Sequence, residues 1–245
     1  TPAQLEAAIT DKTKALVLNN PSNPTGMIYS KEELEALAEV CLRHDIYIIA
    51  DEIYYRLCYD GRKFTSVAAL GEEVKKHTII INGVSKSYSM TGWRCGFAAC
   101  GDKRIAKVMT NCLSHALGNI GAMNQAAMAE AMRGPQDSVE EMRKVFEERR
   151  NYLVERMNAM PLLHAPKPEA TFVSFFDVRE TGMSSQEFAD YSKEHCKVAL
   201  VPGTVKWFGP GGEGNVRLCF STSHAILKEA LDRIEAGMQE LAGKL

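Results

Sequence analysis

Polar and ionisable residues follow three apolar stretches of the sequence, at residues 14–20, 46–50 and 78–82. The residues are Asn23, Asp51, Tyr54, Ser85, Lys86 and, a little later, Arg94. In an open parallel α/β sheet, ligands bind beyond the carboxyl ends of the strands. If the three stretches are neighbouring parallel strands, their polar residues meet at one edge of a sheet.

Each of these residues also has an ordinary structural explanation. Asn23 lies in "NPTG", whose residue types are common in turns. Asp51 is suited to capping a helix, Tyr54 to packing, and Lys86 to the solvated surface. Their joint placement after three strands is what favours a functional interpretation.

A lysine amine in a partly desolvated cleft becomes a nucleophile, and its most familiar use is a Schiff base with pyridoxal phosphate (PLP). That cofactor needs a carboxylate at its pyridine nitrogen, donors at its phenolic oxygen, and arginine and hydroxyl groups at its phosphate. Asp51 could meet the first need, Asn23 and Tyr54 the second, and Ser85 with Arg94 the third.

Alternating strand and helix patterns predict an α/β fold for the first half of the chain. The segment 30–45 is a predicted helix that begins in a capping box, with Ser30 as N-cap and Glu33 three residues later. The segments 14–20, 46–50, 78–82 and 94–100 are predicted strands. Continuous apolar strands separated by helices predict a mostly parallel sheet covered on both faces.

The second half predicts a smaller α/β domain. Helices are expected at 102–115, 118–133 and 135–160, and a proline-rich connection follows at 161–171. Strands are expected at "TFVSFFDV", "KVALV" and "NVRLCFS", with helices at "SSQEFADYSKEHC" and from about His224. We place the boundary inside the long helix, so that residues 1–145 form part of a large domain and residues 146–245 a small one.

Composition narrows the class of protein. The 245 residues have a formal net charge of −2 and no basic block, which gives no support to nucleic acid or an anionic membrane as a partner. The seven irregularly spaced cysteines are typical of reduced thiols in a cytoplasmic protein. No histidine or cysteine cluster has metal-ligand spacing, so no metal site is expected.

Four motifs in this order, "NNPSNPTG", "DEIYY", "NGVSKSYSMTGWRCGF" and "VRLCFSTS", resemble the class I/II aminotransferases of PLP fold-type I. The resemblance covers the whole chain and is nearest to the prokaryotic-type aspartate and aromatic branch. It implies a PLP-dependent transfer of an amino group between an L-amino acid and a 2-oxo acid, in a homodimer.

The resemblance also implies a role for each matching residue. Lys86 would hold the cofactor and then move protons. Asp51 would pair with the pyridine nitrogen, Asn23 and Tyr54 with the phenolic oxygen, and Arg94 with the phosphate. Arg217, in "NVRLCFS", would bind the substrate carboxylate through its two-pronged guanidinium, which lysine cannot reproduce.

The chain departs from the family pattern in two respects. Many members have a serine three residues before the lysine, where this chain has Gly83, and Ser85 could contact the phosphate instead. The resemblance also implies roughly a hundred further residues before the first motif, about the size of a small domain. We therefore expect an N-terminally truncated aminotransferase that is poorly active alone.

Two alternatives remain at this stage. One is a PLP-dependent β-lyase that splits C–S bonds, which would share proton removal by Lys86. The other is a non-catalytic, ligand-sensing aminotransferase-like domain of a transcription regulator. The identity of the amino-acid substrate is not evident from the sequence.

Overall fold

The computed structural model describes residues 1–116 and 118–244. The chain divides into two compact units, one of residues 1–21 and 28–140 and the other of residues 22–27 and 141–245. The boundary at 140/141 lies within helix α6 (Asp137–Asn158), as does the domain boundary expected at 145/146. The short segment 22–27 belongs to the second unit, although both its neighbours in sequence belong to the first.

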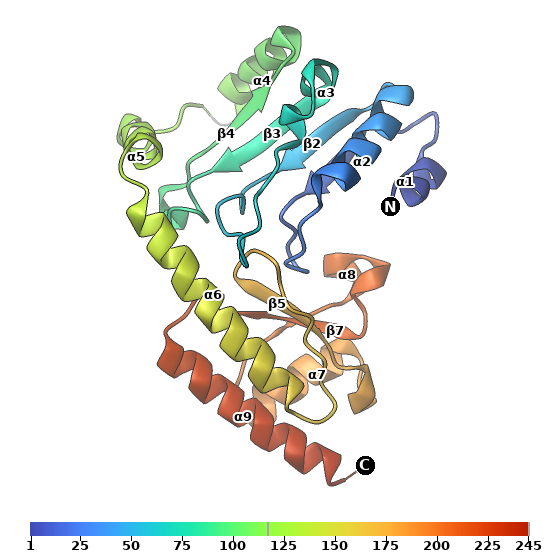
Figure 1. The fold of residues 1–245 in the computed structure, drawn as a ribbon, viewed down its shortest axis with the longest axis vertical. Coiled ribbons are helices and arrows are strands. Elements are labelled where there is room, and N and C mark those ends of the chain that lie inside the picture. The colour runs from blue at the N-terminus through green and yellow to red at the C-terminus, as the bar shows by residue number, and fades with distance from the viewer. Residues whose placement is uncertain (117, 245) are drawn as a thin grey trace. The chain divides into compact units, whose positions relative to one another are not determined.

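The first unit contains a four-stranded sheet in the order β1-β2-β3-β4 (Figure 1). Its strands are β1 (Ala15–Asn19), β2 (Tyr47–Asp51), β3 (Thr78–Gly83) and β4 (Gly96–Cys100). The first three are parallel and β4 is antiparallel to β3, which confirms the predicted mostly parallel sheet. Its helices are α1 (Pro2–Ala8), α2 (Lys31–Arg43), α3 (Glu72–His77), α4 (Lys103–Ala116) and α5 (Ala122–Arg133).

Helix α2 begins where the sequence predicts. Ser30 Oγ accepts the backbone N–H of Glu33, and the Glu33 carboxylate accepts the backbone N–H of Ser30. Both reciprocal bonds satisfy amide groups that the first helical turn leaves without partners. The apolar residues on one face of α2 are buried: Leu34, Leu37, Ala38 and Cys41.

One face of the large sheet is packed and the other is not, among the described residues. Leu18, Ile48 and Ala50 form a core with α2 and α3, which lie over that face in Figure 1. On the opposite face Val17 is 70% exposed and Ile81 is 38% exposed. The expected covering of both faces is therefore met on one face only within the described residues, because strand hydrophobicity indicates that a face is suited to burial but not which segment covers it.

The second unit contains a three-stranded antiparallel sheet in the order β5-β7-β6. Its strands are β5 (Val173–Asp177), β6 (Val201–Pro202) and β7 (Asn215–Cys219), and its helices are most of α6, α7 (Ser185–Tyr191), α8 (Val205–Phe208) and α9 (His224–Ala242). The strand expected at "KVALV" is reduced to β6, because only Val201 of this stretch and the following Pro202 pair with β7.

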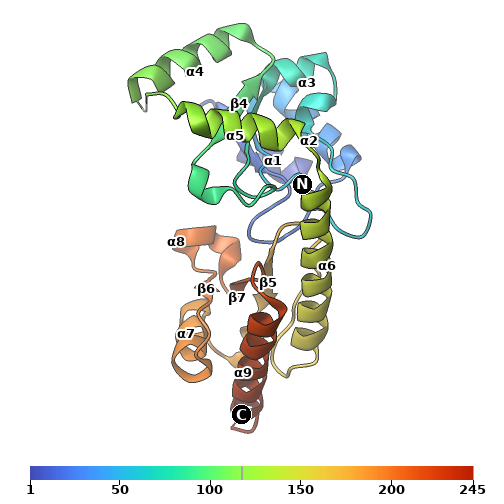
Figure 2. The ribbon, with the colours of Figure 1, turned by 90° about the vertical axis from the view of Figure 1, so that its left-hand side faces the viewer.

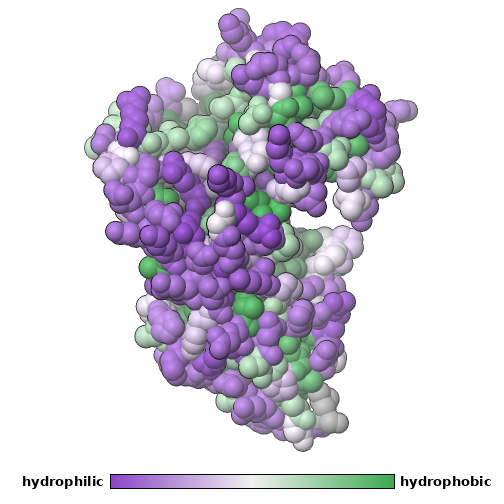
Figure 3. All heavy atoms as spheres, viewed as in Figure 1, coloured by the Kyte–Doolittle hydropathy of each residue, from purple (hydrophilic) through white to green (hydrophobic). Residues whose placement is uncertain are grey.

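Helices α6 and α9 run side by side in the second unit (Figures 1 and 2). Arg156 of α6 donates hydrogen bonds to Asp232 and Glu235 of α9, each at 2.8 Å. Beneath these ion pairs the helices bury Leu153 and Leu231 completely. The exposed side of α6 is largely hydrophilic (Figure 3). None of the helices in the described ranges is long and apolar enough to cross a membrane.

Candidate functional site

Asp51 is the last residue of β2, and hydrogen bonds hold both its backbone carbonyl and its side chain. Its carbonyl accepts the backbone N–H of Asn20 at 3.0 Å and the side-chain amide of Asn19 at 3.2 Å. Its carboxylate Oδ1 accepts the backbone N–H of Ile53 at 3.2 Å, which orients the side chain at the strand end. Tyr54, three residues later, is buried, with 3% of its surface exposed.

Lys86 lies in a tight turn directly after β3. The carbonyl of Val84 accepts the N–H groups of Tyr88 at 3.2 Å and Met90 at 3.3 Å, so the chain folds back around the lysine. Residues 84–90 thereby form a compact loop at the carboxyl end of the strand that pairs with β2. Lys86 itself is half-buried.

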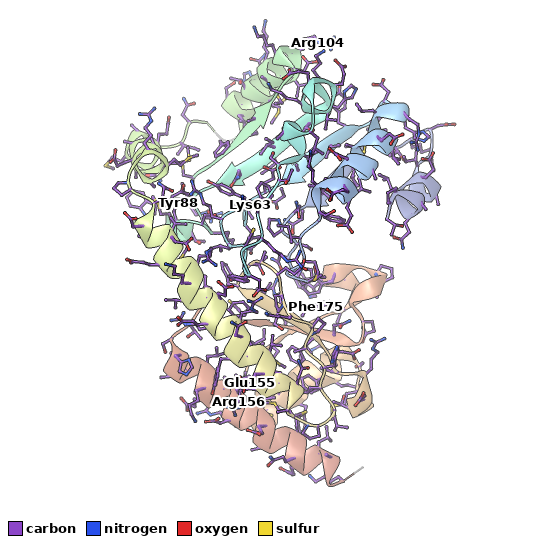
Figure 4. The ribbon with its side chains drawn as sticks, in the orientation of Figure 1. Lys63, Tyr88, Arg104, Glu155, Arg156 and Phe175 are labelled. Carbon is purple, nitrogen blue, oxygen red and sulfur yellow. The ribbon has the colours of Figure 1, made fainter. Side chains whose placement is uncertain are left out.

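Two side chains beside Lys86 fix this loop to its surroundings. Ser87 is fully buried, and its hydroxyl donates to the carbonyl of Ile53 at 3.4 Å. Tyr88, labelled in Figure 4, donates its hydroxyl to the side-chain carbonyl of Gln136 at 3.0 Å. Ser87 therefore joins the lysine loop to the loop that follows Asp51.

Arg94 is brought to the same end of the sheet by β4. Gly96 of β4 pairs with Gly83, the last residue of β3, and Val84 N–H bonds to the Cys95 carbonyl at 3.4 Å. Arg94 has a left-handed backbone, with φ 51°, and its guanidinium donates to the Thr91 carbonyl at 3.0 Å. The side chain is exposed.

Gly83 leaves no room for the serine that the family pattern expects there. A Cβ atom at this position would lie 2.9 Å from both the carbonyl oxygen of Cys95 and the Cα of Gly96. Both contacts are with backbone, which cannot swing away as a side chain can. Ser85, directly before the lysine, is held by its backbone carbonyl, which accepts a bond from Thr91 Oγ1 at 2.8 Å.

Asn23 belongs to the second unit. Its loop is attached there by the carbonyl of Gly26, which accepts the N–H groups of Glu169 and Ala170, both at 2.8 Å. Gly26 has φ +71° and packs directly on Pro168. The loop that the sequence assigned to the end of β1 is thus held by a segment nearly 150 residues further along the chain.

Arg217 lies at the centre of β7 and contacts Asn23. Its Nη1 donates to Asn23 Oδ1 at 3.0 Å, and its guanidinium carbon lies 5.6 Å from the centre of the Phe208 ring. Arg217 as a whole is half-buried. The structure therefore pairs two residues that sequence reasoning assigned to different partners.

The predicted site residues form two groups, one in each unit. All five of Asp51, Tyr54, Ser85, Lys86 and Arg94 lie in the first unit. Asp51 ends β2, and the other four lie on loops at the same end of the sheet. Asn23 and Arg217 lie together in the second. The roles assigned to all seven residues stay predictions.

Sequence reasoning missed the residues that support these groups. Glu52 is 4% exposed and accepts bonds from Ser66 Oγ at 2.8 Å and Val67 N–H at 3.2 Å, and its burial raises the pKa of its carboxyl. Burial also raises the pKa of Tyr88 to about 12, with a further contribution from a hydrogen bond with Tyr55. Their adjacency to Asp51 and Lys86 was the only signal available in the sequence.

Comparison with protein families identifies the chain. The model of the family described as "Aminotransferase class I and II" matches residues 1–234. The chain belongs to this family. The resemblance carried by the four sequence motifs is thereby confirmed.

Curated relatives include aspartate aminotransferases and a related transaminase. The chain is 47% identical to the aspartate aminotransferase of Bacillus subtilis, with 96% of this chain and 60% of the relative covered. It is 45% identical to the asparagine–oxo-acid transaminase of Streptococcus mutans, with 98% and 61% covered. The chain thus spans about three fifths of the length of the curated relatives it matches.

Solved aminotransferase structures have the same fold. An aromatic aminotransferase from Pyrococcus horikoshii matches with a TM-score of 0.93 at 36% identity, covering 98% of this chain and 64% of that one. The aspartate aminotransferase from Rhizobium meliloti gives 0.91 at 37% identity, covering 98% and 61%. A PLP-bound putative aminotransferase from Clostridium difficile gives 0.92 at 26% identity, covering 97% and 61%. The fold is accordingly that of PLP fold-type I aminotransferases.

Proposed function

We propose that the protein containing this chain is a PLP-dependent aminotransferase that moves an amino group between an L-amino acid and a 2-oxo acid. The observation that supports this most directly is the bond between Ser87 and Ile53. It joins the loop of Lys86 to the loop of Asp51 at the ends of adjacent parallel strands. A nucleophilic amine and a carboxylate on joined loops are the pair that this chemistry requires.

The donor set fits PLP. Lys86 offers an amine for the aldehyde, Asp51 a carboxylate for the pyridine nitrogen, and Arg94 with Ser85 a guanidinium and a hydroxyl for the phosphate. The side-chain carbonyl oxygen of Asn23 accepts the bond from Arg217. Its amide N–H₂ is therefore the group that would donate to the phenolic oxygen, in addition to the hydroxyl of Tyr54. No residue of the set carries a charge of the same sign as the PLP group that it would contact.

PLP, when bound, accepts the amino group and delocalises the electrons left when the substrate loses its Cα proton. In our proposal Lys86 Nζ would take the Cα proton of the substrate and later give it up again. The Asp51 carboxylate would hold a proton at the pyridine nitrogen of the bound group, which would stabilise the charge that develops during proton transfer. Arg217 binds the substrate α-carboxylate through paired hydrogen bonds.

We also propose a homodimer in the cytoplasm as the form of the complete protein. The seven cysteines are free thiols in the described structure, as in a reducing compartment. On α4, Val108 is 60% exposed and Leu113 is 49% exposed, which is an apolar surface suited to a second subunit. Light scattering of the purified complete protein would measure the oligomeric state.

Borohydride reduction of the complete, PLP-loaded protein tests the central assignment. The reduced cofactor should be found by peptide mapping on Lys86, and Lys86→Ala should abolish amino transfer. A label on another lysine together with activity in Lys86→Ala would refute the assignment. Release of more than one equivalent of 2-oxo acid per site without an amino acceptor would instead support the lyase alternative.

A further inference from the structure

The guanidinium of Arg217 is held by an aromatic ring as well as by Asn23. Its carbon atom lies 5.6 Å from the centre of the Phe208 ring, within the range of a cation–π contact. Nη1 is at the same time bonded to Asn23 Oδ1 at 3.0 Å. One contact restrains the guanidinium over the ring and the other fixes its direction.

The small sheet determines where Phe208 can lie. Phe175 of β5, labelled in Figure 4, is directly opposite Arg217 of β7, so both side chains are on the same face of the sheet. The rings of Phe175 and Phe208 are 5.3 Å apart at 52°. This distance is typical of a favourable aromatic pair. Phe175 therefore supports Phe208, which in turn contacts Arg217.

Two glycines allow the loop that bears Phe208 to close on this face. A Cβ at Gly203 would lie 3.0 Å from the Phe175 ring and 2.2 Å from the carbonyl oxygen of Gly212. A Cβ at Gly212 would lie 2.8 Å from Cβ of Phe208. Any side chain at either position would push the loop outward and withdraw the ring from Arg217.

We propose that Phe208 is a positioning residue for carboxylate recognition by Arg217. The inference rests on the proposed function, in which Arg217 binds the α-carboxylate of both substrates. A free arginine side chain must lose rotational freedom each time it binds a carboxylate. Contact with Phe208 orders the guanidinium beforehand, so the amino acid and the 2-oxo acid bind more tightly.

The neighbouring aromatic residue provides a matched control. Trp207 is 67% exposed, and its ring is contacted by Lys206 Nζ at 5.6 Å. It is in the same short helix as Phe208 and of similar chemistry. Truncating Trp207 therefore removes an aromatic ring from helix α8 while leaving the Arg217 contact in place.

The kinetic test compares three variants of the complete, PLP-loaded protein. Phe208→Leu should raise KM for both the amino acid and the 2-oxo acid by about 2- to 30-fold, the range of one cation–π contact, with kcat and PLP affinity little changed. Phe208→Tyr keeps the ring face and should restore both KM values. Trp207→Leu should leave them unchanged. Unaltered KM values in Phe208→Leu would overturn the proposal.

Crystal structures give a readout that does not depend on activity. In Phe208→Leu the guanidinium of Arg217 should leave Asn23 or occupy more than one rotamer, and in Phe208→Tyr it should stay. An unchanged Arg217–Asn23 bond in Phe208→Leu would overturn the positioning role. A wild-type protein without amino transfer would refute the proposed function, and the crystal structures would still decide the role of Phe208.

Discussion

Replacing Gly26 by alanine should destabilise the second unit and displace Asn23 from Arg217. Gly26 has φ +71°, and a Cβ there would lie 2.6 Å from Cβ of Pro168 and 3.1 Å from the Ala170 carbonyl oxygen. The loop cannot relax by a simple shift, because the Gly26 carbonyl accepts two backbone bonds of 2.8 Å from residues 169 and 170. The added methyl group must therefore strain the loop or break those bonds.

The size of the effect follows from two separate costs. A left-handed conformation costs a residue with a Cβ about 1–2 kcal/mol. Forcing an extra carbon into a packed contact costs about 1–3 kcal/mol more. We therefore expect Gly26→Ala to lower the free energy of unfolding by about 2–5 kcal/mol, the sum of these two costs.

Gly182→Ala is the matched control for this prediction. Gly182 lies in the same unit and has φ +74°, but no atom lies within 4 Å of the position that an added Cβ would occupy. Its replacement should incur only the conformational cost, about 1–2 kcal/mol. Urea unfolding of the complete protein measures both variants. Equal losses in the two would refute the steric role of Pro168, and an unchanged substrate KM in Gly26→Ala would refute the displacement of Asn23.

Three further predictions concern other parts of the chain. Gly83→Ser should lower the melting temperature and weaken PLP binding, because the added Cβ would lie 2.9 Å from backbone atoms. Gly92→Ser is the control and should change neither property, because nothing lies within 4 Å of its added Cβ. Similar melting temperatures of the two variants would contradict this prediction. Glu6 bonds His44 Nε2 at 2.5 Å, and this hydrogen bond, together with an arginine contact, lowers the pKa of the Glu6 carboxyl below 4.5. The stabilisation from the ionised Glu6 is thus present above pH 4.5 and is lost as pH falls through the lowered pKa. Glu6→Gln should therefore have a lower free energy of unfolding than wild type at neutral pH and the same value in acid. A difference in this free energy that does not change with pH would count against the prediction. Arg217→Lys keeps the charge and loses the paired hydrogen bonds, so KM for both substrates should rise about 10-fold or more, with PLP affinity retained; unchanged KM values would make Arg217 a structural residue.

The parts of the fold that depend on local sequence were predictable. The capping box at Ser30 occurs as the sequence indicates, and the strand expected at residues 94–100 is present as Gly96–Cys100. The short extent of the strand at "KVALV" and the covering of only one face of the large sheet were not predicted from the sequence. A strand's extent depends on its partner's reach, and its burial on segments elsewhere in the chain, neither of which is encoded locally.

The sequence by itself determined which residues are suited to the chemistry and that Asp51 and Lys86 lie at the carboxyl ends of two predicted strands, because strand ends and turn residues are local properties. The structure shows that these two strands, β2 and β3, are adjacent. Only the tertiary structure decided which residues hold them. Asn23 and Arg217 are 194 positions apart in sequence, and their bond exists because backbone bonds from residues 169 and 170 attach the loop of Asn23 to the second unit. The contact of Phe208 with Arg217 likewise depends on the register of β5 against β7 and on close packing at two glycines. Such contacts are set by how distant segments pack, and no spacing within the sequence specifies them.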